Sequence, residues 1–224
     1  MDAAVTVAGE ELELCAERAV AWRRRRMWLV ADPHFGKAAS FRALGVHVPS
    51  GTTSTALGRL DGLIARLSLE SRVERIVFLG DFLHAKEGRS EEAFAAIAFW
   101  RASHADIAMT IVRGNHDRRA GDPPASVGMT CVDGPMMEGG FALAHHPLSV
   151  PGKYVLAGHV HPCAVLVGPA RQRERLPCFW FSEARRVGVL PVFGEFTGCA
   201  EVEADAGDDI FVVAEGSVLR GSRS

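Results

Sequence analysis

The clearest structural signal in this sequence is Ile76-Val77-Phe78-Leu79-Gly80-Asp81. Four consecutive apolar residues are typical of a strand that is buried on both faces, and this run leads directly into a glycine and an aspartate. Four similar runs lead within three residues into Asp, Asn or His, at residues 28–31, 107–112, 141–144 and 154–157. Because functional crevices lie beyond the carboxyl ends of such strands, we expect these polar side chains to share one edge of a sheet.

Helical patterns separate the first three runs. Leucine and isoleucine recur at helical spacing through residues 57–67, after Thr53, Ser54 and Thr55, which are able to cap a helix. A second helical pattern covers residues 94–101 and follows Ser90. Strands that alternate with helices predict an α/β fold with a largely parallel core.

The pattern changes after about residue 162, where the helical signal fades. Short strand-like runs at 165–167, 178–181, 187–190 and 210–213 then alternate with turn residues. We expect them to form a second sheet that packs on the first. The predicted fold is an α/β, four-layer αββα sandwich of two mixed sheets flanked by helices, built as one domain over residues 1–224.

Composition narrows the class of protein. The chain has 224 residues, 48% of them hydrophobic, and a formal net charge of −2, which gives no overall attraction to nucleic acid or to an anionic membrane. Five cysteines without a C-x-x-C pair indicate reduced thiols rather than a secreted disulfide framework. The acidic N-terminus lacks the apolar region of a signal peptide, so we predict a cytoplasmic protein with no membrane partner.

Histidine is concentrated at the strand ends. Seven of the nine histidines lie in five short clusters, at positions 34, 84, 116, 145–146, 159 and 161. Asp32 and His34 are two residues apart, as are His159 and His161, and in an extended chain that spacing points both side chains to one side. Carboxylates with imidazoles suit Mn, Fe, Zn or Co rather than Ca, and the absence of thiolates argues against a structural zinc site.

Three glycines and one asparagine add to this signal. Glycine immediately precedes Asp81, Asn115 and His159, where a missing Cβ permits unusual φ values and close approach. The amide oxygen of Asn115 is able to coordinate a cation without adding negative charge. The adjacent His116 then stays free as a proton donor, and we expect Asp117 to fix its tautomer.

The ordered motifs D-x-H, G-D, G-N-H-D, H and G-H-x-H, from residue 32 to residue 161, resemble the calcineurin-like metallophosphoesterase superfamily. The resemblance implies two divalent cations, with Mn expected first and Fe, Zn or Co as alternatives, and phosphoester hydrolysis by a hydroxide that both cations share. It also implies a ligand set: Asp32, His34 and His161 for one cation, Asn115, His145 and His159 for the other, and Asp81 as a bridge between them. His145 is favoured as the ligand over the adjacent His146, which would lie next to the ligands.

A narrower likeness covers nearly the whole chain. The segments that carry it are Asp32-Pro33-His34-Phe35-Gly36-Lys37, Phe41-Arg42, Pro49-Ser50-Gly51-Thr52, Gly80-Asp81-Phe82-Leu83-His84, Leu176-Pro177-Cys178-Phe179-Trp180 and Leu190-Pro191-Val192-Phe193-Gly194-Glu195-Phe196-Thr197-Gly198. They are similar to the bacterial ligase-associated DNA damage response endonuclease group, PdeM, although Pro33 stands where leucine is expected. This likeness implies a phosphodiesterase or nuclease acting on DNA in repair, with DNA ligase, helicase and nuclease partners.

Several readings stay open. Lys37, Arg42 and Arg118 are placed either to meet substrate phosphates or in solvent, and His84 either lines the substrate cleft or makes a structural hydrogen bond. The basic run at residues 23–26 either tracks a nucleic-acid backbone or is the exposed tip of a hairpin, which is the commoner outcome. Alternative functions are a phosphomonoesterase or nucleotide hydrolase acting on small molecules, and a non-catalytic scaffold that binds metal.

Overall fold

The computed structural model describes residues 1–49, 51–70, 72–167 and 172–221; Ser50, one of the residues in the narrower resemblance, lies outside them. The apolar run at 76–79 forms strand β5 inside a seven-stranded sheet of order β1-β2-β3-β4-β5-β6-β7. Its strands are β1 (Ala3–Val7), β2 (Glu10–Cys15), β3 (Ala19–Trp22), β4 (Met27–Val30), β5 (Arg75–Phe78), β6 (Ala108–Val112) and β7 (Thr130–Val132). Neighbours are antiparallel from β1 to β4 and parallel from β4 to β7.

The second sheet follows the order β14-β11-β12-β13-β10-β9-β8, and β15 pairs with both β12 and β16. Its strands are β8 (Met136–Glu138), β9 (Phe141–Leu143), β10 (Tyr154–Ala157), β11 (Pro162–Val167), β12 (Arg173–Ser182), β13 (Val187–Val189), β14 (Ala200–Glu201), β15 (Asp209–Ala214) and β16 (Ser217–Arg220). β9, β10 and β13 are parallel, whereas β12 runs antiparallel to its neighbours β11, β13 and β15.

Two sequence-based expectations about the sheets need correction. The second sheet begins at Met136, not near residue 162, so the predicted strands at 141–144 and 154–157 belong to it. The five strands that lead to the predicted ligands therefore belong to two sheets rather than to one. Apolar runs buried on both faces look alike in either sheet, so periodicity cannot assign them.

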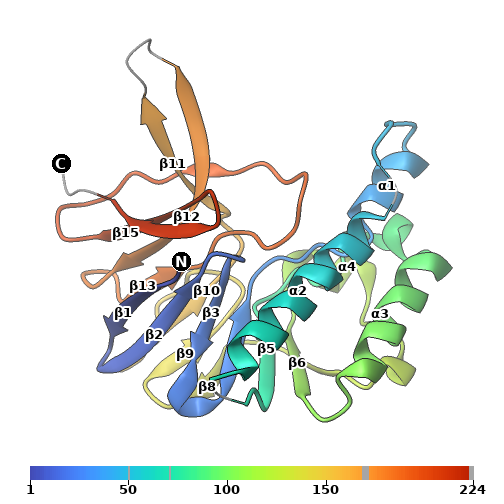
Figure 1. The fold of residues 1–224 in the computed structure, drawn as a ribbon, viewed down its shortest axis with the longest axis horizontal. Helices are drawn as coiled ribbons and strands as arrows, with labels where there is room; N and C mark the ends of the chain where they lie inside the picture. Colours follow the sequence, from blue (N-terminus) through green and yellow to red (C-terminus); the bar gives the residue numbers. More distant parts are fainter. Residues whose placement is uncertain (50, 71, 168–171, 222–224) are drawn as a thin grey trace.

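All α-helices of the described residues lie between Lys37 and Ala120, and Figure 1 shows them gathered on one side of the molecule. They are α1 (Lys37–Ala43), α2 (Thr52–Ser68), α3 (Glu91–Ser103) and α4 (Asn115–Ala120), with short 3₁₀ turns η1 (Arg23–Arg25), η2 (Lys86–Gly88) and η3 (Ala125–Val127). No helix of the part of the chain that the structure describes is long and apolar enough to cross a membrane.

The two predicted helices form, but only one is capped as expected. Ser90 caps α3 by accepting a hydrogen bond from the backbone N–H of Ala93 at 3.2 Å. The cap of α2 is instead Gly51, at φ +80°, and no side chain caps it. The hydroxyl of Thr55 donates back to the Gly51 carbonyl at 3.1 Å, and that of Thr53 accepts from the backbone N–H of Gly36. The predicted Ser/Thr cap of α2 is therefore wrong.

Three apolar layers hold the elements together. Leucines and Trp100 on α2 and α3 pack on one face of the first sheet, against Ile76 and Phe78. Between the sheets, Trp22 and Leu29 meet Phe141, and buried aromatic rings of this kind bury about 150–250 Å² each. The α/β sandwich of two mixed sheets is confirmed.

The outer face of the second sheet has a different cover from the outer face of the first. Its buried residues, among them Val155 and Trp180, pack against Val150 and Val202 in loops. The indole N–H of Trp180 donates to Asp208 at 2.8 Å. Loops therefore provide the layer that helices provide on the opposite side of the sandwich.

Candidate metal centre

The predicted ligands lie in loops that follow strands of both sheets. Asp32 and His34 follow β4, Asp81 follows β5 and Asn115 begins α4 after β6. From the second sheet, the ligand loops follow β9 and β10 and contribute His145, His159 and His161.

The structure brings these seven side chains together in two groups. In the first, His161 Nε2 lies 3.3 Å from His34 Nε2 and 3.6 Å from Asp32 Oδ2. In the second, His145 Nε2 lies 2.8 Å from the amide oxygen of Asn115 and 3.1 Å from His159 Nδ1.

Asp81 stands between the two groups. Its Oδ1 is 3.4 Å from His145 Nε2, and its Oδ2 is 4.0 Å from His34 Nε2. One carboxylate thus faces both sets of atoms, as a bridging ligand must.

The atoms that face one another in this cluster are acceptors. His145 donates from Nδ1 to the carbonyl of Leu79 at 3.1 Å, and His161 donates from Nδ1 to the carbonyl of Gly198 at 3.2 Å. Each neutral ring carries a single N–H, so both Nε2 atoms hold lone pairs. Asp32 Oδ1 is buried and has no hydrogen-bond partner among the described residues. Convergent acceptors without a proton between them fit a cation, since buried polar atoms otherwise find a partner.

Burial favours the neutral form of the titratable side chains in this cluster. It lowers the pKa of His145 to about 3 and that of His161 to about 4, which leaves both rings neutral and able to donate lone pairs. Burial also raises the pKa of Asp81 to about 6, and burial together with the charge of Asp81 raises the pKa of Asp32. A bound cation favours the ionised form of both carboxylates and opposes this rise.

The backbone at the site is held in an uncommon conformation. Asp32, His34, Asp81, His159 and His161 all have positive φ, between +48° and +68°. A non-glycine residue in the left-handed region costs on the order of 1–3 kcal/mol and persists only where the surroundings enforce it. Backbone hydrogen bonds between the loops do so here: the N–H of His34 donates to the Asp81 carbonyl at 2.9 Å, and the N–H of His159 donates to Asp32 Oδ2 at 2.8 Å.

The glycines before the ligands have the predicted role of permitting close approach. A Cβ on Gly114 would lie 2.2 Å from Asp81 Oδ1, and a Cβ on Gly158 would lie 2.5 Å from Asp32 Oδ2. A Cβ on Gly80 would lie 2.3 Å from a ring nitrogen of His145. Each glycine therefore makes room for a ligand from a different motif.

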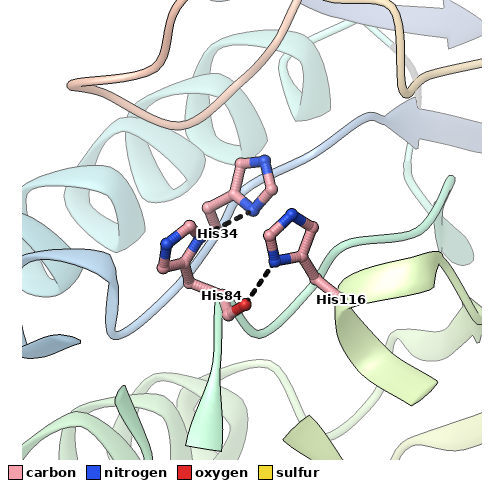
Figure 2. A group of neighbouring side chains, drawn as sticks. All are labelled: His34, His84 and His116. Carbon is pink, nitrogen blue, oxygen red and sulfur yellow. Dashed lines mark hydrogen bonds between the residues drawn. The ribbon is translucent and has the colours of Figure 1, made fainter. Parts of the chain in front are cut away.

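His116 is near the cluster, but the group that orients its ring is not the one predicted. Its Nδ1 donates to the backbone carbonyl of His84 at 2.5 Å (Figure 2). Its Nε2 is 3.9 Å from Asp81 Oδ2. Asp117 accepts instead from the backbone N–H groups of Leu83 at 3.0 Å and Gly114 at 2.9 Å. The expectation that Asp117 fixes the His116 tautomer is wrong: Asp117 ties two ligand loops together. A backbone carbonyl leaves no trace in a sequence, so His84 was missed in this role.

His146 and His84 contact different histidines of the cluster. The ring of His146 is exposed and lies 4.1 Å from the ring of His159, whereas His145 is buried among the other acceptors. His84 is half-buried, and its ring stacks on that of His116 with centroids 4.9 Å apart and planes at 20°.

The three basic side chains expected near the substrate differ in whether they have a polar partner. Lys37 is half-buried, has a pKa lowered by that burial, and makes no ion pair in the described part of the chain, with its ammonium 5.6 Å from the Phe41 ring. Arg42 donates to the carbonyl of Pro49, and Arg118 pairs with Asp133 at 3.2 Å. Of the three, Lys37 alone has no polar partner for its side chain among the residues that the structure describes.

The basic run at residues 23–26 lies at the opposite ends of β3 and β4 from the cluster. All four arginines pair with glutamates: Arg23 with Glu13 and Glu70, Arg24 with Glu10, Arg25 with Glu138, and Arg26 with Glu74. These contacts favour the reading as a hairpin tip and leave the run little free charge for a nucleic-acid backbone.

The protein is therefore an α/β sandwich of two sheets with a candidate metal centre. Aspartate, asparagine and histidine side chains from loops of both sheets form this centre. The chain belongs to the family of the nuclease MPE of Pseudomonas putida: it is similar to the crystal structure of that nuclease with 40% identity and a TM-score of 0.85, over 98% of this chain and 100% of the other.

A second solved structure is similar to only part of the chain. The protein of unknown function AQ665 from Aquifex aeolicus matches 60% of this chain and 78% of its own, with 17% identity and a TM-score of 0.39. No protein-family model and no curated protein matches the chain.

Proposed function

We propose that this protein is a nuclease that hydrolyses phosphodiester bonds with the help of two divalent cations. The observation that carries the proposal is the pair of acceptor groups that share Asp81, together with the buried Asp32 Oδ1 that has no hydrogen-bond partner among the described residues. The nuclease relative, at 40% identity over nearly the full length of both chains, supports nucleic acid as the substrate.

The resemblance found in the sequence supports one distribution of the two cations over these residues. Asp32, His34 and His161 would hold one, Asn115, His145 and His159 the other, and Asp81 both. Carboxylate, amide and imidazole donors suit Mn, Fe, Zn and Co alike, and the resemblance found in the sequence makes Mn the first choice among them. Bound cations of this kind supply positive charge that neutralises phosphate oxygens and makes water more acidic.

The chain's own groups position the substrate and move one proton. His116 Nδ1 donates to the His84 carbonyl, so its Nε2 is the ring atom left to protonate the leaving oxygen, which it does when the ring carries a second proton as an imidazolium. Lys37, which makes no ion pair among the described residues, lies near His34 and His84 and gives a phosphate a positive charge to approach. Arg118 is occupied by Asp133 and takes no part in this proposal.

From the resemblance found in the sequence, we also propose that the protein is a member of the calcineurin-like metallophosphoesterase superfamily and of its ligase-associated group. Its role would then be DNA repair in the cytoplasm, together with a DNA ligase, a helicase and a nuclease. It also treats residues 1–224 as one catalytic domain, because both sheets contribute ligands.

The test compares metal-free protein with protein loaded with Mn²⁺ on bis-p-nitrophenyl phosphate, on p-nitrophenyl phosphate and on labelled DNA. Metal-dependent cleavage of the diester and of DNA is the expected result. Turnover of the monoester alone would reject the nuclease proposal and indicate a phosphomonoesterase. Tight binding of metal without any turnover would indicate a scaffold.

A further inference from the structure

Phe196 is an exposed aromatic side chain beside the candidate metal centre. It is 54% exposed, and no ring or cation of the described residues packs on its face. The other exposed phenylalanine in the described part of the chain is Phe99, which lies on the regular helix α3. Single apolar side chains on a surface are common and need no explanation. The backbone and the position of Phe196 distinguish it from such a side chain.

The backbone of Phe196 has φ +55°. For a bulky residue this left-handed conformation is an outlier, and it persists only where the surroundings enforce it. The ligand loops enforce it here. Before Phe196, the N–H of Gly194 donates to the carbonyl of Asp32 at 3.0 Å, and after it the N–H of Ala200 donates to the carbonyl of His161 at 3.0 Å. The loop that presents the ring is therefore held at both ends by residues predicted to bind a cation.

Phe196 also shares a hollow with the predicted phosphate contacts. It lines this hollow together with His34 and Lys37. Glu195 lies in the same lining, but its carboxylate pairs with Arg59 at 3.4 Å, which offsets its repulsion of an anion. A nucleobase is joined to its phosphate through a single sugar, so a base whose phosphate lies at the cluster is able to reach this hollow.

We propose that Phe196 is a specificity-determining residue that stacks on the base of a nucleotide adjoining the phosphate to be cleaved. Every base has a π face, and aromatic side chains with an open face bind such faces with little regard to sequence. The constrained backbone fixes the ring before the substrate arrives, so less freedom is lost on binding. The inference rests on the proposed function, because it assumes cleavage of a phosphodiester at the cluster.

Three diesters with one leaving group isolate the contribution of the base. Thymidine esterified with p-nitrophenyl phosphate at its 5′ oxygen, and the isomer esterified at its 3′ oxygen, place a base on either side of the phosphate. Methyl p-nitrophenyl phosphate has no base. Release of p-nitrophenolate by the Mn²⁺-loaded protein gives kcat and KM for all three.

Phe196→Ala should raise KM for at least one thymidine ester by about 5–150-fold, the range expected when a ring that stacks on a base is removed. Its kinetic constants for the methyl ester, and its content of Mn²⁺ by elemental analysis, should match the parent. Phe196→Trp should keep the parental KM because it keeps an aromatic face, whereas Phe196→Leu, apolar but without a π face, should resemble Phe196→Ala. Phe99→Ala is the matched control and should match the parent on all three esters.

A parental KM of Phe196→Ala for both thymidine esters would overturn the inference. So would an equal rise in KM for the methyl ester, or a loss of Mn²⁺, because the ring would then support the ligand loop rather than a base. If Phe196→Ala does not fold, Phe196→Leu decides by the same criteria. A parent protein that hydrolyses none of the three diesters would refute the proposed function, and the inference with it.

Discussion

Gly114→Ala tests whether the site depends on the room left by its glycines. Gly114 has φ −89° and ψ −175°, a conformation that alanine adopts freely, so the substitution adds steric pressure without backbone strain. The new Cβ would lie 2.2 Å from Asp81 Oδ1 and 2.5 Å from the backbone nitrogen of Asp81, where ordinary contact begins at 3.4 Å. Either the loop or the Asp81 side chain must move by roughly 1 Å, and a displacement of that size at a catalytic site can cost about 10²-fold in rate.

Stability should fall as well. Overpacking of this kind costs about 1–3 kcal/mol, which corresponds to about 2–12 °C in the unfolding midpoint of a domain of this size. The expected result is a folded protein that holds less Mn²⁺ per chain, measured by elemental analysis after gel filtration, and hydrolyses bis-p-nitrophenyl phosphate about 10²-fold more slowly.

Gly62→Ala is the matched control for this change. Gly62 lies inside α2, and a Cβ there meets nothing within 4 Å. Helix propensity then predicts a gain of about 0.5–1 kcal/mol with no change in metal content or rate. If Gly114→Ala binds two Mn²⁺ and turns over at the parental rate, the tight placement of Asp81 is not what the site requires.

Three further predictions concern single side chains. His116→Ala should keep both cations but lose about 10²–10⁴-fold in rate, most for poor leaving groups; an equal loss for p-nitrophenyl and alkyl esters would reject its role as proton donor. Asp117→Asn turns an N–H donor toward backbone amides and should cost about 1–3 kcal/mol in chemical denaturation, with the leaving-group ratio unchanged. Burial of Asp208 raises its pKa, but hydrogen bonds from Ser182 and Trp180 outweigh burial and leave the pKa below 3.8. Asp208→Asn should therefore lower the free energy of unfolding at pH 7, and this difference from the parent should disappear as the pH falls below about 4. A difference that persists at pH 2 would contradict this.

The strands and the polar side chains that follow them could be predicted from the sequence because each apolar run ends at a polar residue. The run at 76–79 and the residues after it fall where the pattern predicts, and the same holds for β9 and β10. Which sheet each strand joins was not accessible, since a buried strand has the same composition in either one. The covering of the second sheet by loops is likewise a matter of long-range packing.

Within the site, sequence indicated the side chains but not the backbone. The carbonyls of Leu79, His84 and Gly198 orient three histidines, and a carbonyl is present at every residue of any chain. The left-handed conformation of Asp81 is equally hidden, because aspartate occurs far more often outside that region. Asp117 shows the resulting error: its place beside His116 in sequence suggested a partner that the fold gives to the backbone.

Electron paramagnetic resonance of the Mn²⁺-loaded protein asks whether one carboxylate serves two ions. Two ions that share Asp81 should give the spectrum of a spin-coupled pair, at two Mn²⁺ per chain, and Asp81→Ala should abolish the coupling. Signals of isolated Mn²⁺ alone in the fully loaded parent would contradict the account.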